Sequence, residues 1–271
     1  MSVFFFFALA TVVGSLSTLF WIPEDDLGRG YFQMNALIVL GLLALVWAVV
    51  VLPPLDPFGA HGGAGRLLLT LGTVGSGLYY GAIYRERWRA SRWAAGLALA
   101  GCGGALVYAT RTLIHLATPL PYRGPLAVAG LLTSALLLGW SLIAMLLGHW
   151  YLVAPRLTFR HLVVFCWVLL GAVVLRLAAL GGTLAAAISV DELVEPHPWR
   201  VLTSVEGQGM FFWFRLAWGL LIPLALAVMS LHCARQRSNQ SATGILYVLV
   251  VGTTIGEITA YYLAVTTGIP A

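Results

Sequence analysis

The feature that most constrains the fold is a series of about eight apolar runs. A helix needs about 20 apolar residues to cross a bilayer. The runs lie at about 2–21, 34–52, 67–84, 94–115, 126–152, 161–182, 210–232 and 243–267. Only 9% of the residues are charged, compared with about 25% in a typical soluble domain. The sequence therefore predicts an all-α, polytopic integral membrane bundle of about eight helices, forming a single transmembrane domain over residues 1–271.

The distribution of arginine predicts the orientation of this bundle. All fifteen basic residues are arginine. If the N-terminus lies outside, the inner connections hold nine arginines and the outer connections hold three. Because cytoplasmic loops collect basic residues, we expect both termini outside and a multi-pass protein of the bacterial inner (cytoplasmic) membrane. Residues 189–209 form the one long hydrophilic loop, which this topology places outside.

Several ionisable residues fall inside the apolar runs, namely Arg111, His115, Arg176, Arg215 and Glu257. A charge at this depth costs about 2.5–3.5 kcal/mol on insertion scales, so it usually faces the bundle interior. Arg176 lies 16 residues after Arg160, which is on the order of 24 Å along a helix. Glu257, the only acid in any run, lies at a similar depth. The spacing predicts one polar layer in the outer leaflet.

Two interpretations of this layer stay open from the residues alone. Glu257 could form a buried ion pair with Arg176 or Arg215 that only fixes helix packing. Alternatively, the layer could line a polar cavity for a small polar-headed or anionic ligand. Glu257 or His115 would then exchange protons with that ligand.

Two histidines near the inner ends of their helices raise a different possibility. His149 and His232 lie on runs that cross the membrane in the same direction. A b-type haem needs one histidine on each side of the ring, so these two are alternative haem ligands. They could instead be interfacial residues. The sequence has no phosphate loop, HExxH motif, nucleophile elbow or nucleotide fingerprint, and the three cysteines lack CxxC spacing.

The C-terminal run Gly256-Glu257-Ile258-Thr259-Ala260-Tyr261-Tyr262-Leu263 carries a resemblance to a known family. It is similar to the end of the membrane anchor subunits of dimethyl sulfoxide reductase and polysulfide reductase type complexes, which often close with Gly-Glu and an aromatic pair. The resemblance implies about eight helices with both ends outside and a quinol site towards the outer face, usually without haem. Gly256 and Glu257 are the positions that match.

Together, the resemblance and the polar layer lead us to expect a quinone/quinol-interacting subunit of a respiratory-type redox complex. The expected proton-exchanging residues are Glu257 and His115. The expected quinone-binding residues are Arg111, Arg176, Arg215, Gly256 and Tyr261. The substrate would be menaquinone or ubiquinone, with no metal in the chain, although haem b remains the alternative at the histidines.

The expected partners are membrane lipid and redox subunits docked on the outer face, with no nucleic acid. Two other functions remain open. The chain could be a transporter of a small anionic substrate, or a bis-histidine cytochrome b-like electron carrier.

Overall fold

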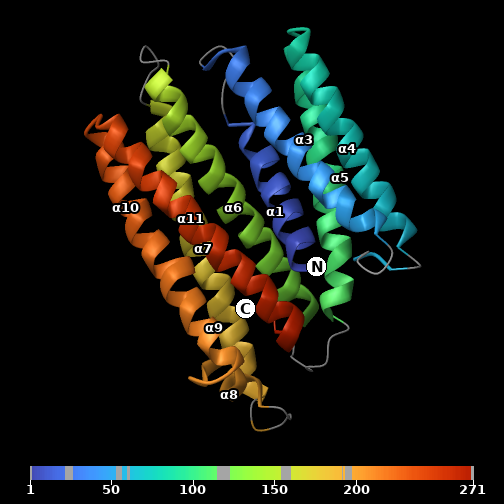
Figure 1. The fold of residues 1–271 in the computed structure, drawn as a ribbon, viewed down its shortest axis with the longest axis vertical. Coiled ribbons are helices and arrows are strands. Elements are labelled where there is room, and N and C mark those ends of the chain that lie inside the picture. Colours follow the sequence, from blue (N-terminus) through green and yellow to red (C-terminus); the bar gives the residue numbers. More distant parts are fainter. Residues whose placement is uncertain are drawn as a thin grey trace.

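The computed structural model of the chain is a bundle of long helices (Figure 1). It describes residues 2–21, 27–52, 57–59, 62–114, 123–153, 160–190, 192 and 197–269. The long helices are α1 (Ser2–Thr18), α3 (Arg29–Val51), α4 (Gly63–Tyr84), α5 (Trp88–Ile114), α6 (Arg123–Val153), α7 (Arg160–Val190) and α11 (Asn239–Thr267). A further long helical segment consists of α9 (Gln208–Phe214), the π-helix η2 (Arg215–Leu221) and α10 (Ile222–Arg235), and α8 (Pro198–Thr203) is short.

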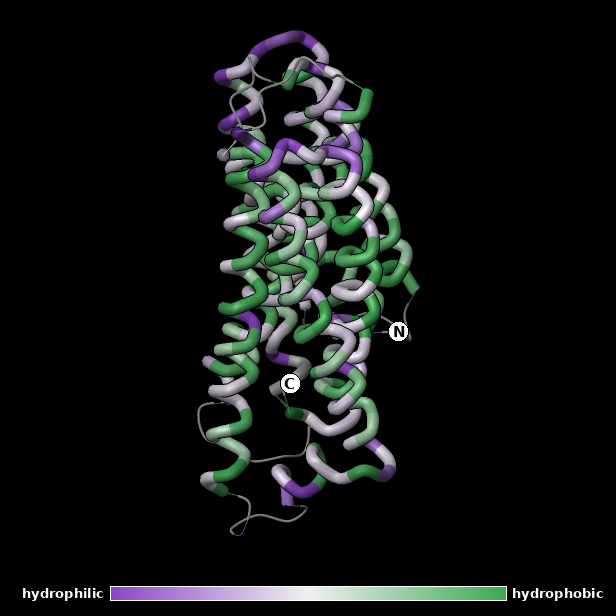
Figure 2. The backbone as a smooth tube through the Cα atoms, turned by 90° about the vertical axis from the view of Figure 1, so that its left-hand side faces the viewer, coloured by the Kyte–Doolittle hydropathy of each residue, from purple (hydrophilic) through white to green (hydrophobic). Residues whose placement is uncertain are grey.

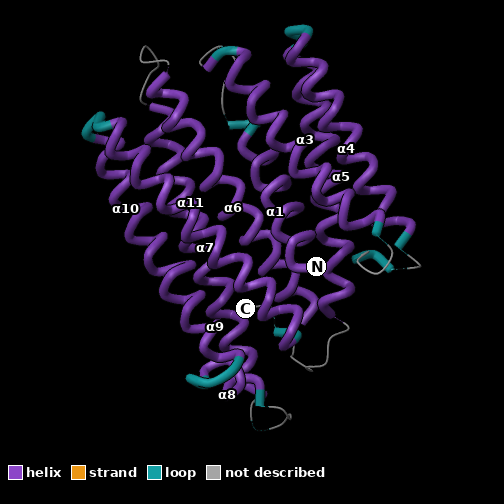
Figure 3. The backbone as a smooth tube through the Cα atoms, viewed as in Figure 1, coloured by secondary structure: helices purple, strands orange, loops and turns teal. Residues whose placement is uncertain are grey.

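The predicted fold class is confirmed. Within the described ranges, seven helical segments are long and apolar enough to cross a membrane, and α1 is a shorter apolar helix beside them. These ranges contain helices and loops but no strand (Figure 3). Hydrophilic residues gather towards the two ends of the bundle, and apolar residues dominate between them (Figure 2). By the length and composition of its helices, the chain is a multi-pass membrane protein.

The loop predicted at 189–209 differs most from the structure. Helix α7 continues to Val190 instead of ending near residue 182, and α8 occupies part of the remaining segment. The alanine-rich stretch after Gly182 favours continued helix. The other predicted boundaries, including the end of α1, shift by a few residues.

Helices α6 and α11 form the centre of the bundle. Helix α6 packs against α1, α5, α7 and α11, and α11 also contacts the segment from α9 to α10. In the most apolar stretch of α6, 67% of the residues are buried, whereas the corresponding share is 33% in α3 and in α4, which lie at the periphery. Gly14 of α1 and Gly139 of α6 allow a close crossing, because a Cβ on Gly14 would lie 1.8 Å from a backbone oxygen of α6.

The ends of the bundle follow the predicted arrangement of connections. The α4–α5 and α10–α11 turns, which carry arginines, lie at the end away from the labelled chain termini (Figure 1). Figure 1 also places the C-terminus of α11 and the start of α1 towards the other end. The assignment of these ends to the two sides of a membrane stays a prediction.

The π-helix η2 has a local cause in the sequence. Pro223 has no backbone N–H and cannot donate to the carbonyl of Gly219, four residues earlier. The helix widens before it, and the N–H of Ile222 donates to the carbonyl of Ala217, five residues back. Such π segments inside long helices are frequent at functional sites. Here the segment begins at Arg215, one of the ionisable residues predicted to lie in the membrane.

Candidate functional site

The core of the candidate site is an ion pair between Arg176 of α7 and Glu257 of α11. The Arg176 Nε donates to both carboxylate oxygens at 3.0 and 3.2 Å, and Nη2 donates to Oε2 at 2.9 Å. Both side chains are buried. The contact has the two-pronged geometry in which a guanidinium matches a carboxylate best. It joins two helices that are distant in the sequence.

Arg215 brings a second cation to the same carboxylate from η2. Its Nη2 lies 3.6 Å from Glu257 Oε1, which is close enough for an ion pair but too long for a hydrogen bond. The side chain is only 1% exposed. Among the described residues, none of its three guanidinium nitrogens has a hydrogen-bond partner. Two arginines against one carboxylate give this charged cluster of Arg176, Glu257 and Arg215 a formal charge of +1.

The electrostatic balance around Arg215 does not explain its burial. Glu257 attracts the Arg215 guanidinium, whereas Arg176 repels it. Removing a guanidinium from water is costly, and a buried charge usually recovers that cost through good geometry and hydrogen bonds. Arg215 has the charge contact but lacks the hydrogen bonds among the described residues. Its three guanidinium nitrogens are therefore buried without a hydrogen-bond acceptor among the described residues.

Hydroxyl groups of α6 and α11 extend the polar layer on either side of Glu257. Tyr261, one turn further along α11, shares a hydrogen bond with Ser134. Thr253, one turn before Glu257, lies 3.2 Å from the Ser141 hydroxyl. All four residues are buried. The cluster is therefore bordered by a short series of paired hydroxyls between α6 and α11.

Glycines allow η2 and α11 to approach each other beside the cluster. A Cβ on Gly219 would lie 2.5 Å from the Cα of Gly256, and one on Gly256 would lie 2.3 Å from the Cα of Gly219. Gly256 was predicted as a quinone-binding position. In the structure its observed contact is this helix crossing, which positions Arg215 and Glu257 on facing helices.

The structure brings together only part of the predicted layer. Arg176, Arg215 and Glu257 meet, and Tyr261 lies one turn from Glu257. Arg111 does not join them in the described part of the chain. It is exposed on α5, with its guanidinium 4.6 Å from the centre of the Tyr108 ring. His115 lies outside the described residues.

The predicted alternative haem ligands lie on exposed parts of their helices. His149 Nδ1 is 3.1 Å from the hydroxyl of Tyr247, and His232 Nε2 is 2.9 Å from the side-chain nitrogen of Gln236. Both histidines are exposed. Haem binding by this pair stays a prediction. In the described ranges, no group of three or more histidine, cysteine or acidic side chains could hold a metal ion.

Sequence reasoning missed Ser134, Ser141 and Gly219. Ser134 and Ser141 are seven residues apart, which places them on one face of α6, so their spacing was a signal that could have been used.

The comparisons with protein families, curated proteins and solved structures found no match for this chain.

Proposed function

We propose that the chain is a quinone/quinol-interacting integral membrane subunit of a multi-subunit redox complex. The observation that carries the proposal is Arg215, a buried guanidinium beside a buried carboxylate with no hydrogen-bond partner for its nitrogens among the described residues. A quinone head group has two carbonyl oxygens, which accept hydrogen bonds, on an apolar ring that suits a membrane interior. The resemblance of the Gly256–Leu263 run to quinol-binding anchor subunits supports the same class of substrate.

The roles of the residues follow from this geometry. Arg215 donates to a head-group oxygen, while Arg176 holds the Glu257 carboxylate in place through its two-pronged contact. Quinol oxidation releases two electrons and two protons. Glu257 or His115 accepts one proton, the second proton leaves to water at the outer face, and the electrons pass to a redox centre of a partner subunit docked over residues 189–209. Quinone reduction runs the same steps in reverse.

The proposal is tested by purifying the protein with native lipid and measuring bound quinone. We expect quinone to co-purify with the native chain and with Glu86→Gln. This control makes the same change in an exposed ion pair with Arg29. Glu257→Gln is expected to abolish quinol oxidation. Its melting temperature must be measured alongside, because it removes the carboxylate between two buried cations. Unchanged quinol oxidation in a folded Glu257→Gln protein would show that the site is wrongly assigned.

The charge of the cluster favours a second candidate function, transport of a small anion. Two arginines and one glutamate leave one formal positive charge in the interior, which an anionic substrate would neutralise. Reconstituted vesicles separate the two functions. Uptake of an anion by the isolated chain, with no bound quinone and no redox partner in native membranes, would replace the quinol proposal with this one.

A further inference from the structure

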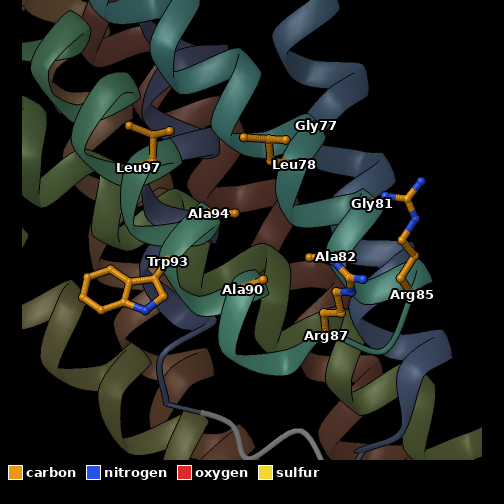
Figure 4. Close-up of a pocket in the computed structure, with 10 residues that line it drawn as sticks. All are labelled: Gly77, Leu78, Gly81, Ala82, Arg85, Arg87, Ala90, Trp93, Ala94 and Leu97. Atoms are coloured by element: carbon orange, nitrogen blue, oxygen red, sulfur yellow. The ribbon is translucent and has the colours of Figure 1, made fainter.

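We propose that the surface of the α4–α5 pair that faces away from the rest of the bundle binds an anionic phospholipid. A groove of about 560 Å³ lies between these two helices, next to the turn that joins them (Figure 4). Its size falls within the usual range for small-molecule sites, roughly 300–1,000 Å³. The groove is lined by residues of α4 and α5 and the turn between them, so it is separate from the charged cluster. The inference does not depend on quinol binding.

Small residues form the floor of this groove. Gly77 and Gly81 are four residues apart on α4, and no atom lies within 4 Å of the position that a Cβ would take on either. Ala90 and Ala94 line the groove from α5 at the same spacing. Because residues four apart share a helix face, each helix presents a strip with little side-chain volume. The space between the strips stays open.

The groove is held open by tight packing between the two helices further from the turn. A Cβ on Gly101 of α5 would lie 2.4 Å from the backbone nitrogen of Gly72, and one on Gly75 would lie 2.6 Å from the backbone nitrogen of Ala98. These backbone contacts fix the distance between α4 and α5. The groove is therefore a built feature of a rigid helix pair.

Arginines stand at one end of the groove and apolar side chains at the other. Figure 4 shows Arg85 and Arg87 near the turn, with Leu78 and Leu97 at the opposite end. The acid between the two arginines, Glu86, has a φ of 54° and pairs with Arg29 at 3.1 Å. Its carboxylate is therefore engaged with α3, and it leaves the positive charge of Arg85 and Arg87 available to a ligand.

The order of charged and apolar residues matches one phospholipid molecule. A phosphate-bearing head group would meet the two arginines, and an acyl chain would lie along the small residues towards Leu78 and Leu97. Trp93 lines the same groove and is 83% exposed, as is typical of tryptophan at the level of lipid head groups. Two cations without a facing acid among the lining residues favour a net anionic lipid over a zwitterionic one.

Lipid binding to the purified full-length chain tests this inference. The chain is titrated with phosphatidylglycerol, phosphatidylcholine or inorganic phosphate, and retained ligand is counted by native mass spectrometry. We expect tight binding of phosphatidylglycerol only. Each arginine near an anionic lipid contributes about fivefold to affinity, so Arg85→Gln with Arg87→Gln should weaken binding about 30-fold. Arg235→Gln with Arg237→Gln, at another arginine-bearing turn of the same end, should leave binding unchanged.

A second pair of variants tests the groove without changing charge. Gly81→Leu fills the floor and should weaken phosphatidylglycerol binding about tenfold. The control is Gly171→Leu on α7, an exposed residue that likewise has no atom within 4 Å of where a Cβ would lie. Both substitutions improve helix propensity, so both proteins should fold.

Two results would overturn the inference. The first is native-like lipid binding by Gly81→Leu, and the second is an equal loss in the two arginine pairs. If the first result comes with loss of a dimer in Gly81→Leu, the groove is assigned to a helix of a second copy. None of these results depends on whether the chain binds quinol.

Discussion

Replacement of Arg215 by methionine separates a functional role of this residue from a structural one. Methionine keeps most of the side-chain volume and removes the charge. The Arg176–Glu257 pair, with its three hydrogen bonds, would remain as a neutral unit. Arg215 makes one 3.6 Å charge contact and is repelled by Arg176, so its net contribution to folding should be small. We expect the free energy of unfolding to change by no more than about 1 kcal/mol, because removing a buried charge often offsets the lost attraction.

Ligand binding by Arg215→Met should change much more than stability. A hydrogen bond to a charged group contributes about 1.5–3 kcal/mol, which corresponds to a loss of roughly 10- to 150-fold in quinol affinity. Binding is measured by titrating a fluorescent quinol analogue, and stability by thermal unfolding in the same detergent. Glu257→Gln provides the contrast, since it leaves two buried cations without a carboxylate and should cost about 3–5 kcal/mol. Two results would refute this reasoning: an Arg215→Met protein as unstable as Glu257→Gln, or one that binds quinol with native affinity.

Other predictions concern helix packing, the paired hydroxyls and topology. Gly256→Ala should destabilise the protein by about 1–3 kcal/mol, because its Cβ would lie 2.3 Å from the backbone of η2, whereas Gly244→Ala, with open space around it, should not; thermal unfolding distinguishes them. Tyr261→Phe and Ser134→Ala should each lower the free energy of unfolding by about 1–3 kcal/mol, because each leaves one buried hydroxyl without its partner. The double variant should lose less than the sum of the two, because it removes both hydroxyls and leaves neither unpaired. Additive losses in that cycle would mean that the hydroxyls do not interact. The Arg87→Cys variant should react with an impermeant maleimide at this position only from the cytoplasmic side, and labelling in intact cells would reverse the predicted orientation.

The helix bundle was predictable because the bilayer sets a minimum length for each apolar run. The depth of Arg176 and Glu257 was also predictable, since each residue of a helix adds a fixed rise. Their meeting in one cluster with Arg215 agrees with that estimate. The sequence shows that Ser134 and Ser141 share a face of α6. It does not show that this face packs against α11.

Arg111 shows what an estimate of depth leaves open, and its role in quinone binding stays a prediction. Its position along α5 suggested the same layer, but depth says nothing about the direction in which a side chain points around the helix axis. On α5 the guanidinium packs over Tyr108, on an exposed face. The π-helix was missed for a related reason. Pro223 predicts a disturbance of the helix, but the sequence does not say whether the helix kinks there or widens into a π-helix.

The charged cluster also has a consequence for the biogenesis of the protein. Its two cations are synthesised before its only anion, because Arg176 and Arg215 precede Glu257 in the chain. Until α11 enters the membrane, the nascent chain carries two buried arginines without this carboxylate, and a charge inside the bilayer costs about 2.5–3.5 kcal/mol on insertion scales. Helix α11 therefore supplies the carboxylate that lowers the formal charge of the cluster from +2 to +1. A chain truncated before residue 257 would hold both arginines in the membrane without their acid, and we expect it to be less stable there than the native chain.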